Sequence, residues 1–358
     1  MIKIIFLYTR LPDYFEQCVA YLVDKYPVEA IIVRYEADRN AQFIFEPKPK
    51  INLVFKSSFD STEKLHAYIN SLNPSIIYCS GWNDKDYMSV ISEWHTKVPT
   101  LMGLDNPWEN TLRQKVGVIL FRLLNKLKFS HIWVAGYNQY EFAKKLGYKN
   151  EKIIFDLYCA NIPNFYKAYS QRLEKINMEG IYPKQLLFIG RFVKYKQPEM
   201  LIRAFKELLD EGKTFGWTLL MIGEGPLKND LKIYENDKIE IKEFLHPNKL
   251  IDEMALSGAF CLPSKSEHWG VVIHEASAAG LPIITTYTTY SATRFVITKF
   301  NGFVFKDSSI SLLKNNLSTL FKMNNDELLR MSNNSYNLSG EINHEKWAAS
   351  MMSILESN

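Results

Sequence analysis

The amino-acid sequence predicts an α/β protein of two doubly wound parallel-sheet domains facing each other across a cleft. The chain has 358 residues, which suits two domains of ordinary size. Short apolar runs alternate with amphipathic segments of helical length, and continuous apolar runs are typical of strands buried on both faces of a parallel sheet. These runs form two series, separated by a segment without clear periodicity at residues 161–184.

The first series opens with an apolar run at residues 2–8, which is too short for a signal peptide and fits a buried strand. Its predicted strands are 2–8, 30–34, 51–55, 75–79, 100–103 and 131–135, and its predicted helices include 62–72 and 87–97. The segment 161–184 carries Pro163, Gly180 and Pro183. We therefore interpret it as the connection between the domains.

The second series has the same alternation. Its predicted strands are 185–190, 217–223, 239–244, 259–263, 282–285 and 302–305, and its predicted helices are 198–210, 247–257, 309–322, 326–338 and 344–356. We expect an N-terminal domain at 1–165 and a C-terminal domain at 166–342, with 343–358 packing back on the first. In such sheets ligands bind beyond the carboxyl ends of the strands, so the cleft is the expected site.

Composition excludes several classes of protein. Hydrophobic residues make up 47% and charged residues 23%, which excludes a disordered chain. Forty-three basic residues against 39 acidic ones leave a net charge of +4, too little to indicate a nucleic-acid partner. The four cysteines form no CxxC motif, and we expect buried free thiols in a reducing compartment. No run of 18 apolar residues occurs, so any membrane contact should be peripheral.

The most informative segment lies at residues 259–282. A predicted buried strand is followed by a polar loop, and a helix should begin near Gly270 and end at Gly280. A loop before a helix N-terminus presents free backbone N–H groups and suits a phosphate, and Gly270 lets a ligand approach the backbone. Glu267 and Glu275 bracket this point, which makes sense if the ligand also carries hydroxyl groups.

Two other strand ends carry related chemistry. After the strand at 185–190, Gly190 is followed by Arg191 and Lys196, two cations that could neutralise a diphosphate. After the strand at 217–223, a turn contains Gly223 and Gly225. Alone this turn is a weak signal, since plain turn chemistry accounts for it equally well.

Taken together from Gln185 to Phe305, these motifs resemble the retaining glycosyltransferases of family 4, the glycosyl transferases group 1, which have the GT-B fold. The resemblance rests on the G-R-x(4)-K segment, the I-G-x-G-P turn, the E-x(7)-E pair and the later G-L-P and N-G-F runs, in that order. It covers most of the second half of the chain.

The resemblance implies a role for each matching residue. Arg191 and Lys196 would hold the diphosphate of a nucleotide-sugar donor and stabilise the leaving group, and Glu267 would contact the hydroxyls of the transferred sugar. Glu275 would bind the ribose hydroxyls. The other expected donor-binding residues are Gly190, Gly223, Gly225, Trp269, Gly270, Val271 and Val272.

The resemblance also implies an activity: retaining transfer of a sugar, expected to be a hexose, to a hydroxyl acceptor. No cofactor and no metal are expected, because Arg191 and Lys196 take the part that a metal has elsewhere. The expected donor is a UDP-sugar and the expected acceptor a glycan or a lipid-linked glycan. The setting implied is bacterial cell-surface polysaccharide or glycolipid synthesis, in the cytoplasm at the inner face of the membrane.

The first half departs from the family pattern. No glycine-rich loop follows the first strand, and Gly103 stands where many relatives have a histidine. Asp105, Asn106 and Trp108 follow the strand at 100–103 and are the candidate acceptor-side residues. The loop at residues 81–84, after the strand at 75–79, could face the cleft in the same way. An Asx turn and a packed loop aromatic would explain these residues equally well.

A basic amphipathic segment lies at residues 113–128. It carries five basic and no acidic residues, and one helical stripe is formed by Leu112, Val116, Leu120, Leu123 and Leu127. This pattern is typical of a helix at an anionic membrane surface. Val118 and Phe121 interrupt its polar side, so a helix packed into the core remains an equal alternative.

Two other functions remain open. A nucleotide-sugar epimerase of similar build would isomerise its donor without an acceptor, and a non-catalytic nucleotide-sugar-binding protein would bind nucleotide without turnover. A redox Rossmann enzyme is disfavoured, because no G-x-G-x-x-G follows the first strand.

Overall fold

A computed structural model describes residues 1–36, 48–123, 128–306 and 308–356. The chain divides into two compact units: unit 1 comprises Met1–Asn161 and Ile342–Asn358, and unit 2 comprises Ile162–Glu341. The first boundary falls four residues before the predicted one. The helix at 344–356, which we expected to pack on the first domain, belongs to unit 1.

Unit 1 is built on a seven-stranded sheet in the order β3-β2-β1-β4-β5-β6-β7, with every neighbouring pair parallel. Its strands are β1 (Ile2–Tyr8), β2 (Val28–Arg34), β3 (Ile51–Phe55), β4 (Ile76–Cys79), β5 (Thr100–Leu104), β6 (His131–Val134) and β7 (Ile153–Ile154). The strand order reverses between β1 and β4, which makes the carboxyl ends of these two strands the expected ligand position of this sheet.

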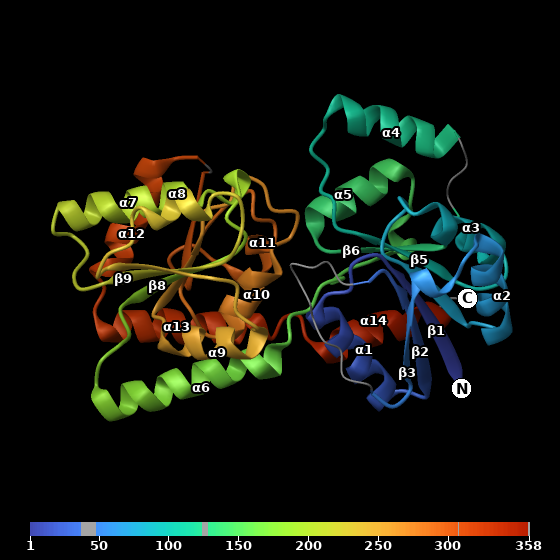
Figure 1. Cartoon of the computed structure of the whole chain (residues 1–358), viewed down its shortest axis with the longest axis horizontal. Coiled ribbons are helices and arrows are strands. Elements are labelled where there is room, and N and C mark those ends of the chain that lie inside the picture. Colours follow the sequence, from blue (N-terminus) through green and yellow to red (C-terminus); the bar gives the residue numbers. More distant parts are fainter. Residues whose placement is uncertain (37–47, 124–127, 307, 357–358) are drawn as a thin grey trace. The chain divides into compact units, whose positions relative to one another are not determined.

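Helices cover both faces of this sheet (Figure 1). They are α1 (Asp13–Lys25), α2 (Thr62–Leu72), α3 (Lys85–Trp94), α4 (Leu112–Leu123), α5 (Tyr137–Leu146) and α14 (His344–Glu356), with short 3-10 turns η1 (Lys56–Ser58) and η2 (Asn150–Lys152). On one face the β1 residues Ile5 and Leu7 join a core with side chains of α2, α3 and α5. On the other face Phe15 of α1 makes edge contacts with Phe6 and with Trp347 of α14.

Unit 2 has a six-stranded sheet in the order β10-β9-β8-β11-β12-β13, and all its neighbouring pairs are parallel. Its strands are β8 (Gln185–Ile189), β9 (Thr218–Ile222), β10 (Ile239–Lys242), β11 (Ala259–Leu262), β12 (Ile283–Thr286) and β13 (Gly302–Phe305). Here the order reverses between β8 and β11. The loops that follow these two strands therefore flank the expected ligand position.

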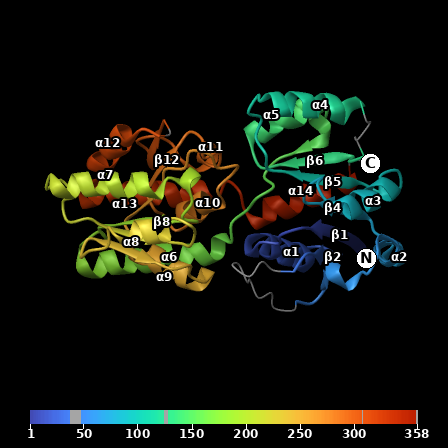
Figure 2. The same ribbon diagram turned by 45° about the horizontal axis from the view of Figure 1, so that its top comes forward.

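The helices of unit 2 also lie on both faces, with α7 beside α12 and α6 beside α9 (Figures 1 and 2). They are α6 (Ile162–Glu179), α7 (Pro198–Asp210), α8 (Lys228–Lys232), α9 (Pro247–Leu256), α10 (Val271–Ala278), α11 (Ala292–Phe295), α12 (Ile310–Phe321) and α13 (Asn325–Ser339), with the short 3-10 helix η3 (Lys194–Lys196). The two sheets and their helical layers match the predicted fold class.

One prediction about this region is wrong. Residues 161–184 were expected to be an irregular connection, but Ile162–Glu179 form the 18-residue helix α6. Its buried positions include Phe165, Ala168 and Arg172. The helical period was hidden because the third of these positions carries an arginine instead of an apolar side chain.

Arg172 is completely buried and donates hydrogen bonds at the ends of two helices. It donates to the carbonyl oxygen of Met254 in α9 at 3.0 Å, to that of Gly280 at 2.7 Å and to that of Ala279. Ala279 and Gly280 follow the C-terminus of α10, where carbonyl groups lack intrahelical partners and a cation is favoured. Arg172 thus fixes α6 against the ends of α9 and α10.

His131 at the start of β6 links the stability of unit 1 to pH. Lys152 Nζ lies 3.4 Å from its Nε2 and Ser130 Oγ lies 2.9 Å from its Nδ1. Lysine can only donate, so Nε2 accepts and the ring is neutral with its proton on Nδ1. Burial, and then the charge of Lys152, lower the pKa of His131 to about 4.

We therefore expect acid to destabilise unit 1 through His131. Between its ordinary pKa near 6.5 and its folded pKa near 4, the unfolded chain binds a proton that the folded chain does not. The free energy of unfolding should therefore be about 3 kcal/mol lower near pH 4 than above pH 6.5. Urea unfolding measured at several pH values in this range should show that the free energy of unfolding decreases less steeply with falling pH in His131→Gln than in the parent. Equal slopes would contradict the assignment.

Candidate functional site

The clearest cluster of charged side chains in unit 2 lies where its strand order reverses. Lys196 in η3 comes from the loop after β8, and Glu267 comes from the loop after β11. Lys196 Nζ lies 2.5 Å from Glu267 Oε2, and both side chains are largely buried. The family resemblance implied that both residues act on the donor, and the structure brings them together from positions 71 residues apart.

The loop after β8 holds Lys196 in place through its backbone. A methyl group at position 190 would lie 3.1 Å from Cδ of Lys196, so Gly190 leaves room for the lysine chain to cross it. The exposed Arg191 donates a hydrogen bond to the hydroxyl of Tyr195, and its guanidinium lies 5.9 Å from the centre of that ring. The backbone N–H of Lys265 donates to the carbonyl of Tyr195 at 2.7 Å. Two cations and a carboxylate are therefore carried by two loops that are joined directly.

The loop after β12 supports the Glu267 loop from the other side. The Glu267 N–H donates to the carbonyl of Thr288 at 3.1 Å, and Thr288 Oγ1 donates to the carbonyl of Ser264 at 2.9 Å. Thr286 Oγ1 donates to the same carbonyl at 2.5 Å. Two hydroxyls thus fix the backbone at Ser264, and a backbone bond fixes it at Glu267, which gives the carboxylate a defined position.

The helix predicted near Gly270 begins at Val271 and continues to Ala278 as α10. Gly270 precedes it with φ of +85°, and a Cβ there would lie 2.9 Å from Cγ of Glu267. Local geometry alone therefore requires glycine at this position. Val271 and Val272 open the helix, where the first N–H groups lack intrahelical acceptors and favour an anion. Glu275 lies one turn further along the same helix.

Three other predicted donor-binding residues have structural reasons of their own. A Cβ on Gly223 would lie 2.0 Å from the carbonyl oxygen of Gly190, and one on Gly225 would lie 2.5 Å from that of Phe192. Both glycines allow the loops after β8 and β9 to touch. The Trp269 side chain is buried, so only its backbone could face a ligand. Donor contact at these positions stays a prediction.

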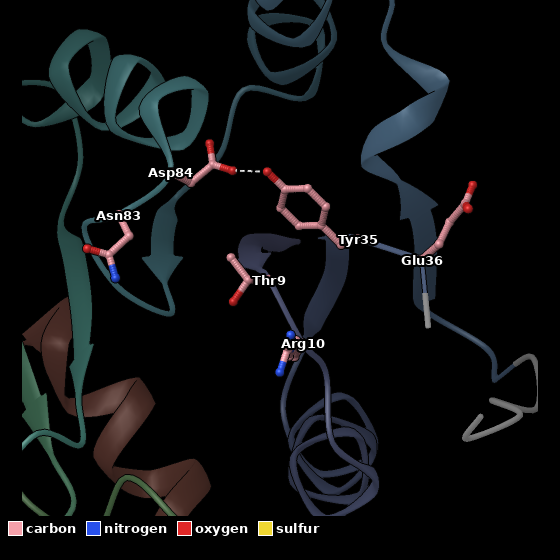
Figure 3. A pocket seen from close by; sticks show the side chains of 6 residues that line it. All are labelled: Thr9, Arg10, Tyr35, Glu36, Asn83 and Asp84. Atoms are coloured by element: carbon pink, nitrogen blue, oxygen red, sulfur yellow. Dashed lines mark hydrogen bonds between the residues drawn. The ribbon is translucent and has the colours of Figure 1, made fainter. Parts of the chain in front are cut away.

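Unit 1 has an open pocket at its own point of strand reversal. It encloses about 440 Å³ and is lined by Thr9, Arg10, Tyr35, Glu36, Asn83 and Asp84. These residues follow β1, β2 and β4, and Figure 3 shows them around the pocket. Sequence reasoning named residues 81–84 only as a loop that could face the cleft and missed Tyr35 and Glu36, because nothing in the sequence shows which strand ends adjoin.

Asp84 is the best-anchored acid of this pocket. Lys56 Nζ lies 2.8 Å from Asp84 Oδ2 and 2.7 Å from Asp86 Oδ2, and the Tyr35 hydroxyl also donates to Asp84 (Figure 3). Burial disfavours the charged form of Asp84, but the hydrogen bonds from Lys56 and Tyr35 outweigh it and lower the pKa of Asp84. The carboxylate is therefore ionised and held in place at the pocket wall.

The acceptor-side candidates after β5 have partners within unit 1. The Tyr158 hydroxyl donates to Asp105 Oδ2 at 3.1 Å, and Trp108 packs on Phe142 with ring centres 5.5 Å apart. Asn106 is exposed. Asp105 and Trp108 thus have structural roles, and acceptor binding by these three residues stays a prediction.

Gly103 occupies the position where the family resemblance implied a histidine, and the structure gives a reason for the glycine. A Cβ at position 103 would lie 2.3 Å from the hydroxyl of Tyr78, a buried side chain of β4. The tyrosine occupies the space that a side chain at position 103 would need.

A group of potential metal ligands lies within unit 1. Ligand atoms of Cys18, Cys159 and His344 lie within 4.8 Å of one another. Cys18 Sγ donates to the carbonyl of Cys159 at 3.8 Å, and burial raises the pKa of the Cys18 thiol. A metal requires the thiolate, so this environment favours a thiol contact that joins α1 to the segment after β7. Sequence spacing could not reveal the group.

Comparison with known proteins bears directly on the unit that carries Lys196 and Glu267. The family model for glycosyl transferases group 1 matches residues 172–338. These residues belong to the glycosyl transferases group 1 family. The match includes Arg191, Lys196, Glu267 and Glu275, so all four side chains lie within the family segment.

A curated relative of this group 1 segment is an uncharacterized glycosyltransferase of Haemophilus influenzae. It is 28% identical over 179 residues, which is 49% of this chain and 49% of that protein. The chain thus matches about half the length of this relative.

Solved structures resemble the chain over its whole length. Anabaena HepE, solved in complex with UDP, has a TM-score of 0.75 at 14% identity over 100% of both chains. Sucrose-phosphate synthase of Thermosynechococcus elongatus has a TM-score of 0.77 at 15% identity, covering 99% of this chain and 98% of that one. The likeness shows that the chain has the GT-B fold that the group 1 resemblance implied.

Proposed function

We propose that this protein is a retaining glycosyltransferase that moves a hexose from a UDP-sugar to a hydroxyl acceptor. The observation that carries the proposal is the pairing of Lys196 with Glu267 at the strand reversal of unit 2. Arg191 on the same loop and the N-terminus of α10 add positive potential there. HepE, a structural relative, has been solved with UDP and with UDP-glucose, which supports UDP as the nucleotide.

In the proposed reaction Lys196 and Arg191 bind the diphosphate and stabilise the negative charge that grows on it as the sugar leaves. Glu267 accepts hydrogen bonds from the sugar hydroxyls, and Glu275 accepts them from the ribose. The acceptor hydroxyl passes its proton to the departing diphosphate on the same face, which retains the configuration of the sugar. Two fixed cations make a metal unnecessary for charge stabilisation.

For the acceptor we propose a glycan or a lipid-linked glycan of the bacterial surface, bound at the pocket of unit 1. The pocket offers a hydroxyl, an amide, a cation and carboxylates, which are groups that hydrogen-bond sugar hydroxyls. Asp84 is held ionised by Lys56 and Tyr35 and can accept such a bond.

UDP should raise the unfolding temperature of the protein, and ADP and GDP should raise it less. A ligand present at a hundred times its dissociation constant stabilises the folded state by about 2.7 kcal/mol. A thermal-shift panel of UDP, ADP, GDP and UDP-sugars, followed by calorimetry with the best binder, measures this. The absence of any shift with UDP would contradict the proposed donor.

Product analysis then separates the three candidate functions. An epimerase would convert the bound UDP-sugar into an isomer without an acceptor, and a binding protein would leave it unchanged under all conditions. A transferase should release UDP faster when an acceptor is added, and EDTA should leave that rate unchanged. Loss of transfer in EDTA would overturn metal independence.

A further inference from the structure

The helix α4 in unit 1 presents an apolar face that no described part of the chain covers. Both views show it beside α5 at the margin of this unit (Figures 1 and 2). Leu112 is 79% exposed and Leu123 is 75% exposed, and three further large apolar side chains are at least half exposed: Val116, Ile119 and Leu120. At 3.6 residues per turn these five positions fall within about 100° of the helix circumference.

The opposite face of α4 attaches the helix to the protein. Phe121 is buried and packs on Trp82 with ring centres 5.6 Å apart, and Val118 is partly buried against the same core. The two residues that interrupt the polar side in the sequence are therefore the ones that face inward. The leucine-rich stripe, which a core-packed helix would bury, faces outward.

Cations flank the exposed stripe on both sides. At the same helical pitch Arg113 borders one edge, and Lys115 and Arg122 border the other; all three are exposed. The sequence has no acidic residue from Arg113 to Lys128. Residues 124–127, the rest of the predicted basic segment with Lys126, lie outside the described residues.

We propose that α4 docks the protein on an anionic lipid surface. The five apolar side chains would enter the acyl region, and Arg113, Lys115 and Arg122 would lie at the level of the lipid phosphates, as in interfacial amphipathic helices. A second copy of the chain is a poorer occupant, because pairing two such faces would bring their cations together. Within the described residues no helix is long and apolar enough to cross a bilayer, so the contact is peripheral.

Vesicle sedimentation tests the proposal with the full chain. The protein should bind vesicles of equal parts phosphatidylglycerol and phosphatidylcholine, bind phosphatidylcholine alone far less, and release as ionic strength rises. The double variant Ile119→Ser, Leu123→Ser should bind anionic vesicles at least tenfold more weakly. Lys115→Gln with Arg122→Gln should weaken binding about 25-fold, at about fivefold per charge.

A matched control lies in unit 2, where Met178 and Ile233 are as exposed as the end residues of the stripe. Met178→Ser with Ile233→Ser should leave vesicle binding unchanged. UDP affinity should be the same in every variant, so failure of the membrane proposal is distinguishable from failure of the proposed transferase. Equal binding by parent and α4 variants, or an oligomer that the α4 variants dissociate, would overturn the proposal.

Discussion

Replacing Lys196 by alanine should slow sugar transfer by a factor of about 100 to 1,000, the cost of removing one preorganised donor to a developing negative charge. Lys196 is the cation that the structure fixes most firmly at the strand reversal of unit 2, because Gly190 and Glu267 both define the path of its side chain. UDP binding should weaken about 30-fold, as expected for the loss of a charge-assisted hydrogen bond worth about 2 kcal/mol.

The neighbouring Lys194 provides the matched control. It belongs to the same 3-10 turn, carries the same charge and is exposed. Lys194→Ala should therefore keep transfer and UDP affinity near those of the parent. Steady-state kinetics and calorimetry on both variants, with circular dichroism to verify folding, measure the difference. A Lys196→Ala enzyme with parental turnover would refute the assignment of Lys196 to the diphosphate.

Replacing Arg172 by alanine should destabilise unit 2 by about 3 to 5 kcal/mol, the range for breaking a buried charged network. Alanine would leave the carbonyls of Met254, Ala279 and Gly280 without their shared donor. Because α10 also carries Glu275, the loss should reach the candidate site.

Hydrogen–deuterium exchange resolves the effect by segment, since two units need not unfold in one step. Peptides from α6, α9 and α10 should exchange faster in Arg172→Ala, and the urea midpoint should fall. Arg203→Ala, at an exposed arginine of α7, should change neither. Unchanged protection of α9 and α10 would show that Arg172 does not hold them.

The sequence was most informative where burial leaves a simple pattern. The strands at 2–8, 51–55 and 302–305 and the helices at 62–72 and 198–210 lie where they were predicted, because continuous apolar runs and amphipathic periods determine them. The helix α6 was not predicted, because the charged residue Arg172 occupies one of its core positions. A buried arginine is tolerated only when hydrogen-bond acceptors satisfy it. For Arg172 these are backbone carbonyls distant in sequence, and the sequence does not show them.

Some parts of the candidate site could likewise be predicted from the sequence, and others could not. Lys196, Glu267 and the start of α10 could be predicted, because each follows an apolar strand with a recognisable loop. The direct pairing of Lys196 with Glu267 could not, since it depends on β8 and β11 being neighbours in the sheet. The unit 1 pocket needs three strand ends together, and the inward orientation of Phe121 on α4 depends on Trp82, which precedes α3.

The return of α14 to unit 1 affects the order in which a ribosome can complete the two units. Unit 2 is one uninterrupted stretch of chain, 162–341, enclosed between the two parts of unit 1. Its residues are all synthesised before α14, whose Trp347 contacts Phe15 and Trp133 in the aromatic core of unit 1. The unit that is begun first is therefore finished last, and its aromatic core remains incomplete while unit 2 is already free to fold.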